Sequence, residues 1–193
     1  MTVAHGFSDS VIGTQHCFRR VAVAMSEPGT RVQVPDVAGT NTVSAAASAV
    51  LLTLTSHDTP LFIDPSFDDD ALIQLLKLHT NPPLVTNPQE AQFALLNGRE
   101  GVCDPSAFFC GTDEAPERSA TLIVDVEQLT SFHELMLTGP GISTYRVISP
   151  VLPLALEGYL CSRPHAFPLG IDVIVTSGDE LIAIPRTTQV EEC

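Results

Sequence analysis

The stretch from residue 163 to residue 188, RPHAFPLGIDVIVTSGDELIAIPRTT, constrains the fold more than any other part of the sequence. Two short apolar, β-branched runs, residues 171–176 and 181–184, are separated by Ser-Gly-Asp-Glu, a composition typical of a hairpin turn. Pro168 and Pro185 bound the two runs, because proline cannot donate into an interior ladder. Both runs are apolar on both faces, so the hairpin is predicted to lie inside a sheet that is covered on two sides.

Charged and polar residues stand at the ends of this predicted hairpin. Its turn pairs position 172 with position 185, which places Asp172 and Arg186 on opposite faces and predicts no ion pair between them. Arg163, His165 and Arg186 are the candidates for binding an anion, because fixed positive charge there lies beside turns that expose backbone amides. The alternative is that the two arginines only tie the hairpin to neighbouring loops.

Length and composition indicate one globular domain that spans residues 1–193. Hydrophobic residues make up 44% of the chain and the mean hydropathy is +0.21, which excludes a disordered protein. The formal net charge of −14 argues against nucleic acid and anionic membrane surfaces as partners. An anionic small molecule would need a local cluster of arginines.

Nothing in the sequence indicates a membrane or secreted protein. No apolar run reaches the roughly 18 residues of a membrane span, and the start, MTVAHGFSDS, lacks the basic and apolar regions of a signal peptide. The five cysteines, at positions 17, 103, 110, 161 and 193, form no disulfide framework. We therefore expect a reduced, cytoplasmic protein.

The N-terminal region predicts a helix over residues 10–26. The Ser8-Asp9-Ser10 cluster is suited to cap this helix, and Pro28-Gly29 ends it. A spacing of about 100° per residue assigns one set of side chains to the buried face and leaves Arg19 and Arg20 to solvent. The predicted buried face consists of Val11, Phe18, Val21, Ala22 and Met25.

Three further helices are expected. The alanine-rich segment 43–54, VSAAASAVLLTL, is a helix former whose small side chains allow close packing, and it is also the candidate interface of a homodimer. Three aspartates at 68–70 complement the dipole of a helix that runs to about residue 79. Pro153 suits the first position of a fourth helix, LALEGYLCSR.

Short strands alternate with these helices. They are predicted at residues 32–34, 59–63, 93–96, 121–126, 135–137 and 145–148, ahead of the C-terminal hairpin. The fold class is therefore α/β, a single-domain mixed sheet flanked by helices.

No motif for a metal or for a phosphate group stands out. Cys161 and His165 are separated by a proline break, and Cys103 and Cys110 lack further ligands with the spacing of a zinc site. Residues 138–141, Thr-Gly-Pro-Gly, follow a strand but match neither a P-loop nor a dinucleotide fingerprint, so they are interpreted as a tight turn. We expect no metal.

Several segments nevertheless carry a resemblance to a known family. They are QHCFRRVAVAMSEPG (15–29), LLTLTSHDTPLF (51–62), LHTNPPL (78–84), SATLIVDV (119–126), LTGPGI (137–142), and RPHAFPLGIDVIV with IAIPRTT (163–188). In this order, and over nearly the whole length, they resemble the phosphonate metabolism protein PhnH, a subunit of the carbon–phosphorus lyase core complex.

The resemblance implies a fold like the large domain of pyridoxal-phosphate-dependent transferases, without the cofactor. It implies a part in the alpha-D-ribose 1-methylphosphonate 5-triphosphate synthase of phosphonate catabolism. There, sister subunits help to join the ribose triphosphate of ATP to an alkylphosphonate, and adenine is released. It also implies a homodimer when the subunit is isolated. No catalytic residue is carried over, because the resemblance assigns none.

Three hypotheses follow. The favoured one is a non-catalytic or shared-site subunit of the synthase complex. The second is a nucleotide- or phosphonate-binding module, or a residual enzyme, that uses Arg163, His165 and Arg186. The third, a pyridoxal-phosphate enzyme, needs a lysine for its Schiff base. The single lysine, Lys77, lies inside the predicted helix LIQLLKLH and is expected at the surface, so no cofactor is predicted.

Overall fold

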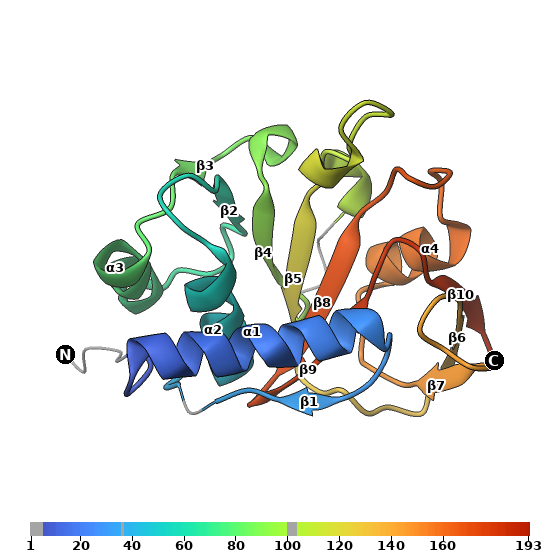
Figure 1. Ribbon diagram of the computed structural model, residues 1–193, viewed down its shortest axis with the longest axis horizontal. Helices are drawn as coiled ribbons and strands as arrows, with labels where there is room; N and C mark the ends of the chain where they lie inside the picture. Colours follow the sequence, from blue (N-terminus) through green and yellow to red (C-terminus); the bar gives the residue numbers. More distant parts are fainter. Residues whose placement is uncertain (1–5, 36, 100–103) are drawn as a thin grey trace.

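Seven strands form a mixed sheet at the centre of the computed structural model, which describes residues 6–35, 37–99 and 104–193 (Figure 1). Across the sheet the strands are β1 (Val32–Gln33), β9 (Glu180–Ile184), β8 (Asp172–Ser177), β5 (Thr121–Asp125), β4 (Phe93–Asn97), β2 (Leu61–Ile63) and β3 (Leu84–Val85). The five strands from β8 to β3 run parallel to one another, and β9 is antiparallel to both of its neighbours.

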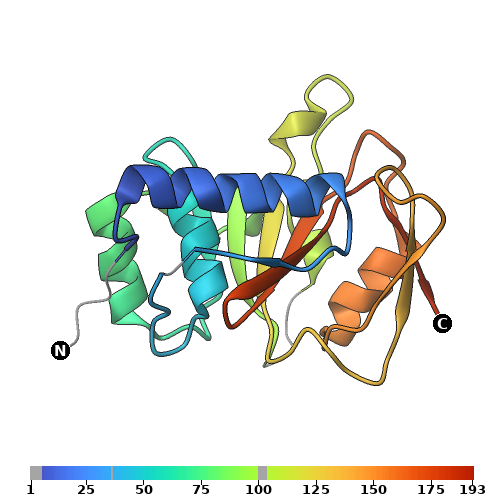
Figure 2. The ribbon, with the colours of Figure 1, turned by 60° about the horizontal axis from the view of Figure 1, so that its bottom comes forward.

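Helices cover one face of this sheet, and a helix with a second, smaller sheet covers the other (Figures 1 and 2). The first face carries α1 (Ser10–Ser26), α2 (Ala45–Leu54) and α3 (Asp70–His79). The second carries α4 (Leu154–Ser162) and the antiparallel strands β10 (Gln189–Glu192), β6 (Leu135–Thr138) and β7 (Arg146–Ile148). Single 3₁₀ turns, η1 (Pro88–Glu90), η2 (Pro105–Ala107) and η3 (Pro116–Arg118), lie in the connections. The predicted α/β class, a mixed sheet flanked by helices, is confirmed.

The C-terminal hairpin has the predicted position and register. Gly178 and Asp179 form its turn, Ser177 pairs with Glu180, and Val173 pairs with Ile184. Side chains of β8 enter both cores: Ile174 packs with the helices of one face, and its neighbours pack with the small sheet and α4 on the other. The hairpin is therefore covered on two sides, as the apolar composition of both faces predicts.

The tip of this hairpin reaches the N-terminal part of the chain. The carbonyl oxygen of Gly178 accepts a hydrogen bond from the amide of Ala46 in the first turn of α2, at 2.9 Å. The carbonyl oxygen of Asp179 accepts another from the amide of Val34, also at 2.9 Å. One of the orphan amides at the start of α2 is thereby satisfied by the far end of the sequence.

The predicted bounds of α1 are confirmed, but its predicted buried face is only partly correct. Val21 is buried and Met25 packs partly buried against the core, whereas Val11, Phe18 and Ala22 are exposed. The side chain of Asp9 accepts hydrogen bonds from the amides of Val11 and Ile12, both at 3.0 Å, and so caps the helix. Phe18, a predicted core residue, is 57% exposed. The buried residues are Cys17, Val21 and Ala24. This narrow stripe of small side chains lets α1 pack closely on α2 and β9, so the bulkier residues are left outside.

α2 is a helix, as predicted, and it is not available as a dimer interface. Ser44 caps it by accepting a hydrogen bond from the amide of Ala47 at 3.1 Å. Residues 46–52 are all buried within the domain, against α1, α3 and the sheet. The expectation that segment 43–54 meets a second copy is therefore wrong, because its small side chains serve close packing inside the domain instead.

α3 begins at its aspartates, as predicted. The side chain of Asp69 accepts from the amides of Ala71 and Leu72 at 3.0 and 3.1 Å. Lys77 and His79 lie in the last turn, where positive charge complements the helix dipole. The side chain of Lys77 is exposed, so its predicted surface position is confirmed.

The predicted tight turn after β6 is also confirmed. The amide of Ile142 donates to the carbonyl of Gly139 at 3.1 Å. Gly141 has a φ of +83°, and a Cβ atom there would lie 2.0 Å from the backbone oxygen of Ser26. Glycine is therefore required at this position by close approach to the end of α1.

Two sequence-based expectations concern cysteines and membranes. Cys17, Cys110, Cys161 and Cys193 are free thiols, and Cys103 lies outside the described residues. Within the described ranges, none of the helices combines the length and the apolar character that crossing a bilayer requires.

Candidate functional site

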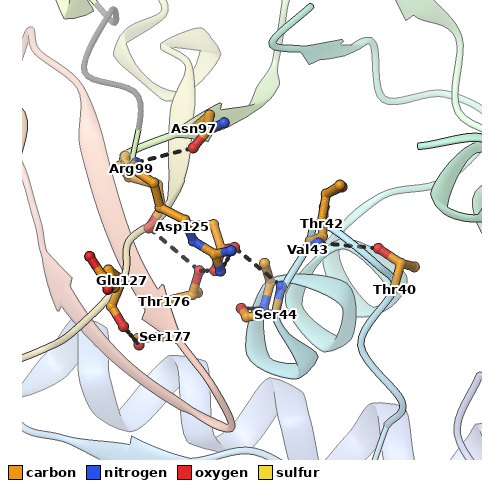
Figure 3. A network of polar contacts seen from close by, with 12 residues as sticks. Thr40, Thr42, Val43, Ser44, Asn97, Arg99, Asp125, Glu127, Thr176 and Ser177 are labelled. Carbon is orange, nitrogen blue, oxygen red and sulfur yellow. Dashed lines mark hydrogen bonds and ion pairs between the residues drawn. The ribbon is translucent and has the colours of Figure 1, made fainter. Parts of the chain in front are cut away.

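The carboxyl ends of the parallel strands carry a buried polar network that involves residues the sequence did not single out (Figure 3). Asp125, the last residue of β5, has a fully buried side chain. Its carboxylate accepts hydrogen bonds from the hydroxyl of Thr176 at 3.0 Å, from the backbone amide of Ser44 at 3.2 Å and from the guanidinium of Arg99 at 2.8 Å. Three separate parts of the chain thus converge on one carboxylate.

The sheet register places these groups. Thr176 on β8 and Asn97 on β4 stand directly beside Asp125 in the parallel ladder. The side-chain oxygen of Asn97 accepts from the amide of Arg99 at 3.1 Å and so fixes the turn that brings this arginine over Asp125. In open sheets with parallel strands, this carboxyl edge is where ligands usually bind.

Burial sets the electrostatics of Asp125. Loss of hydration raises the pKa of its carboxyl group above the ordinary value. The hydrogen bonds from Ser44 and Thr176 and the charge of Arg99 act in the opposite direction without cancelling the effect of burial. Arg99 is 41% exposed, so only one member of the pair is shielded from water.

A second carboxylate, Asp69, fixes the loop that precedes α2. Its side chain accepts hydrogen bonds from the hydroxyls of Thr40 and Thr42 as well as from the first amides of α3. Burial by itself would raise the pKa of Asp69, but the hydrogen bonds outweigh burial and the pKa is lowered. Asp69 therefore acts as an ionised tie between two helix starts.

A hollow of about 310 Å³ opens between this loop and Arg99. Its wall consists of residues 39–45, Arg99 and Gly178. The wall offers hydroxyl groups, the N-terminus of α2 and a partly exposed guanidinium, which are groups that suit an anionic or strongly polar ligand. The sequence signal for this site was the single acid in the buried run TLIVDV, and its meaning depends on strands far apart in the chain.

The three anion-binding candidates from the sequence meet at a different pocket. A hollow of about 520 Å³ is lined by Arg163, His165 and Arg186, together with Phe167 and the turn residue Pro140. His165 and Phe167 are exposed at this pocket, whereas the two arginines are largely buried. The structure thus brings the three candidates together, and their role in anion binding remains a prediction.

The guanidinium of Arg163 is directed toward backbone carbonyls of the C-terminal region. It donates to Thr188 at 3.0 Å, to Pro185 at 3.0 Å and to Ile171 at 3.5 Å. Arg163 also ends α4 in the left-handed conformation, with a φ of +39°. Burial lowers the pKa of its guanidinium, which nevertheless stays charged because arginine titrates far above neutrality.

Arg186 and Asp172 form an ion pair, which corrects the prediction made from strand alternation. The backbone amide of Arg186 donates to the Asp172 carboxylate at 2.8 Å, and its guanidinium bonds the same carboxylate and the carbonyl of Pro116, the latter at 2.7 Å. The predicted register is correct, but β9 ends at Ile184. Beyond that residue side chains no longer alternate between faces, so Arg186 turns back toward the strand start at Asp172.

Neither pocket contains a cluster suited to a metal ion. Within residues 6–35, 37–99 and 104–193, no three His, Cys, Asp or Glu side chains are grouped so as to hold one.

Fold and site together define an α/β domain with a polar site at the carboxyl edge of a largely parallel sheet. A family model, bacterial phosphonate metabolism protein (PhnH), matches residues 5–191. The chain belongs to this family, which confirms the resemblance found in the sequence.

Two relatives carry descriptive names. The chain is 32% identical over 187 residues to "Alpha-D-ribose 1-methylphosphonate 5-triphosphate synthase subunit PhnH" of Rhizobium meliloti (strain 1021), covering 96% of this chain and 94% of the relative. It is also 32% identical over 187 residues to "Putative C-P lyase subunit protein HtxG" of Stutzerimonas stutzeri, covering 91% of this chain and 85% of the relative.

Proposed function

We propose that this chain is a subunit of an alpha-D-ribose 1-methylphosphonate 5-triphosphate synthase in the carbon–phosphorus lyase system. The observation that carries this proposal is the match to a synthase subunit over 94% of that protein's length. In the reaction, a phosphonate oxygen forms a bond to C1′ of the ribose of ATP while the glycosidic bond to adenine breaks. Adenine leaves with a proton, and the triphosphate stays on the ribose.

The chain contributes structure or part of a shared site to this reaction and is not the catalyst by itself. Its buried charged side chains support this role, because their bonds are made to the protein. Asp125 is bonded by three groups of the domain, and Arg163 and Arg186 donate to backbone carbonyls or to Asp172. Sister subunits of the complex are therefore the expected partners, and the chain acts as one domain over residues 1–193.

A genetic and biochemical experiment tests this proposal. A strain that lacks the gene for this chain is grown with methylphosphonate as the sole phosphorus source, and a tagged copy is supplied on a plasmid. We expect growth only with the tagged copy, and we expect the tagged chain to purify together with the other synthase subunits. Growth without the chain, or purification of the chain alone from the rescued cells, would overturn the proposal.

We also propose that the fold is related to the large domain of pyridoxal-phosphate-dependent transferases and has lost the cofactor. The parallel strands that end in Asp125 beside the start of α2 support this relationship. The residues do not fit the cofactor, because the single lysine, Lys77, is exposed on α3. A pyridoxal phosphate titration should give no Schiff-base absorbance band that Lys77→Ala abolishes.

A second candidate function is the binding of a nucleotide or phosphonate in the pocket of Arg163, His165 and Arg186. The meeting of the three side chains at one hollow favours it. The bonds that already occupy both guanidinium groups weigh against it. An ATP titration of the isolated chain and of Arg186→Ala separates the two functions, since only an anion site loses affinity in the variant.

In isolation the chain is expected to form an isologous dimer held by apolar contacts, through a surface other than α2. Sedimentation equilibrium at micromolar protein in ~1 M salt tests this, because an apolar contact survives such screening. A pure monomer would refute the dimer.

A further inference from the structure

The outward face of α1 differs from the rest of the surface. α1 is the longest helix among the described residues and lies along the outside of the domain in both views (Figures 1 and 2). Its inner stripe of small residues packs on α2, β1 and β9. The outer side carries large apolar side chains next to positive charge, and the fold itself makes no use of either.

The apolar part of this face consists of residues that an isolated domain would be expected to bury. Val11 and Phe18 are two turns apart on one side of the helix, and Ala22 follows them on the same side within roughly 40° of arc. Ile12 and Val23 lie on the neighbouring strip of surface, and all five are exposed or partly exposed. A cluster of this kind on a soluble domain usually marks a contact with another molecule.

The polar part of this face consists of His16, Arg19 and Arg20, and the two arginines carry its positive charge. All three are exposed, and they line a hollow of about 480 Å³ between α1 and residues 33–35, the segment that contains the end of β1. Outside α1, Arg118 is also exposed, but the remaining five arginines make bonds within the domain. Each of the following is bonded to a carboxylate or to a backbone carbonyl of this chain: Arg31, Arg99, Arg146, Arg163 and Arg186.

We propose that this face, defined by Val11, Phe18, Arg19, Arg20 and Val23, docks an acidic segment of another synthase subunit that also presents apolar side chains. The inference rests on the proposed function, which supplies the class of partner. Arginine and aromatic residues are the side chains that contribute most to protein interfaces. In a chain of net charge −14, a local group of exposed arginines is complementary to an acidic partner at short range, where salt screens the distant charges.

Other occupants fit the face less well. Free polyphosphate would use the arginines but would leave Phe18 and Val11 in water. A second copy in an isologous arrangement would place the same arginines near each other, which opposes association. A membrane of anionic lipids is an extended charged surface that would also approach the acidic remainder of the chain, whereas a short acidic segment meets this face alone.

The test uses the full chain and the assembled partner subunits. The other synthase subunits are purified without this chain, and its binding to them is measured at about 0.1 M and about 0.5 M salt. The variants are Arg19→Glu with Arg20→Glu, and separately Phe18→Ser. The matched control is Lys77→Glu with Arg118→Glu, which changes the net charge equally at two other exposed cations. Thermal melts verify that every variant is folded.

We expect each α1 variant to weaken binding by about tenfold or more and the control to bind within about twofold of the unchanged chain. The affinity of the unchanged chain should fall with salt more steeply than that of the arginine variant. Equal loss in the control and in the arginine variant would attribute the effect to bulk charge and overturn the proposal. So would unchanged binding by both α1 variants.

Three further outcomes are distinguishable. If the unchanged chain does not bind the other subunits at all, the proposed function itself fails, and the inference fails with it. If the α1 variants shift the sedimentation of the isolated chain, the face belongs to a second copy. If the unchanged chain floats with phosphatidylserine vesicles and the arginine variant does not, the occupant is a membrane surface. Either of the last two results would overturn the proposal that the face binds an acidic segment of a partner subunit.

Discussion

The two edges of the central sheet each hold an arginine–aspartate pair, and the two pairs are built differently. At the carboxyl edge, Asp125 ends β5 with no exposed side-chain surface while Arg99 is 41% exposed. At the amino edge, Asp172 begins β8, and it and Arg186 are 14% and 15% exposed. At the carboxyl ends of the strands a buried aspartate is therefore paired with a solvent-exposed arginine. At the amino ends both members of the pair are largely buried, and we call this pair the clamp.

This difference shows that arginine–aspartate pairs can have two different roles in one domain. Arg186 also donates to Pro116, so each of its three guanidinium nitrogens is bonded within the domain. Arg99 borders the hollow at the start of α2 and retains donors that face water. A ligand or partner subunit can therefore recruit Arg99 without dismantling the fold, and it cannot recruit Arg186 on the same terms.

The largest expected loss of stability comes from removing the carboxylate of Asp125. Asp125→Ala leaves the amide of Ser44, the hydroxyl of Thr176 and the guanidinium of Arg99 without their shared acceptor. Each buried donor left without an acceptor costs about 1 to 3 kcal/mol, so we expect the free energy of unfolding to fall by about 3 to 5 kcal/mol, as measured by urea denaturation. Asp125→Asn keeps an acceptor and should lose clearly less. A loss below about 1 kcal/mol in the alanine variant would mean that the network does not hold the edge together.

The next effect concerns the clamp. Arg186→Ala removes the partner of Asp172 and one tie to the loop at Pro116. The free energy of unfolding should fall by about 2 kcal/mol, because the charge-assisted hydrogen bonds of a largely buried pair are lost. ATP binding should be the same as in the unchanged chain, whether measurable or absent. A stable variant that loses ATP affinity would instead establish an anion site at this pocket.

The pH dependence of stability distinguishes the two carboxylates near the hollow. The raised pKa of Asp125 contributes stability that is complete below the ordinary aspartate value of about 3.9 and is lost as the pH rises through the folded-state pKa. The lowered pKa of Asp69 contributes stability above about 3.9 that is lost as the pH falls through the folded-state pKa. A tenfold difference in acidity between the folded and unfolded states corresponds to roughly 1.4 kcal/mol of stability.

Urea denaturation of Asp125→Asn and Asp69→Asn between about pH 3 and pH 7 measures this contrast. The stability advantage of the unchanged chain should grow with pH relative to Asp69→Asn and shrink with pH relative to Asp125→Asn. Parallel curves for the two variants would contradict the opposite roles assigned to the two acids.

The smallest effect is expected from Arg99→Ala. Its side chain is partly exposed, and Asp125 keeps the bonds from Ser44 and Thr176, so the loss in unfolding free energy should be about 1 kcal/mol or less. Urea denaturation beside Arg186→Ala provides the comparison. A loss as large as that of Asp125→Ala would show that the Arg99–Asp125 pair holds the fold together in the same way as the Arg186–Asp172 pair.

Much of this architecture follows from local sequence. Asp9 and Pro28-Gly29 fix the ends of α1, and the apolar runs around Gly178-Asp179 fix the hairpin and its register. These signals act over a few residues, so they are legible without knowledge of the fold. The same holds for Lys77, whose helix predicts its exposure.

The errors arise where distant parts of the chain decide the outcome. Periodicity identifies α1 as a helix but assigns Phe18 to the core, because the sequence does not show that the neighbours of α1 fit a face of small side chains. Asp125 is invisible as a site until the sheet places Thr176 and Arg99 beside it. The Asp172–Arg186 pair escapes prediction because strand alternation stops at Ile184.

The hairpin between β8 and β9 also bears on how the protein is made. β1 lies at the end of the strand order and pairs with β9, and an amide in the first turn of α2 donates to Gly178. When the ribosome has released the chain only as far as α4, β1 and the start of α2 therefore still lack their hydrogen-bond partners in the hairpin. Closure over such a long separation is slow compared with local folding. The complete site forms only after the hairpin has been synthesised, so a chain cut short before β8 has neither β1 paired in the sheet nor the Thr176 hydroxyl beside Asp125.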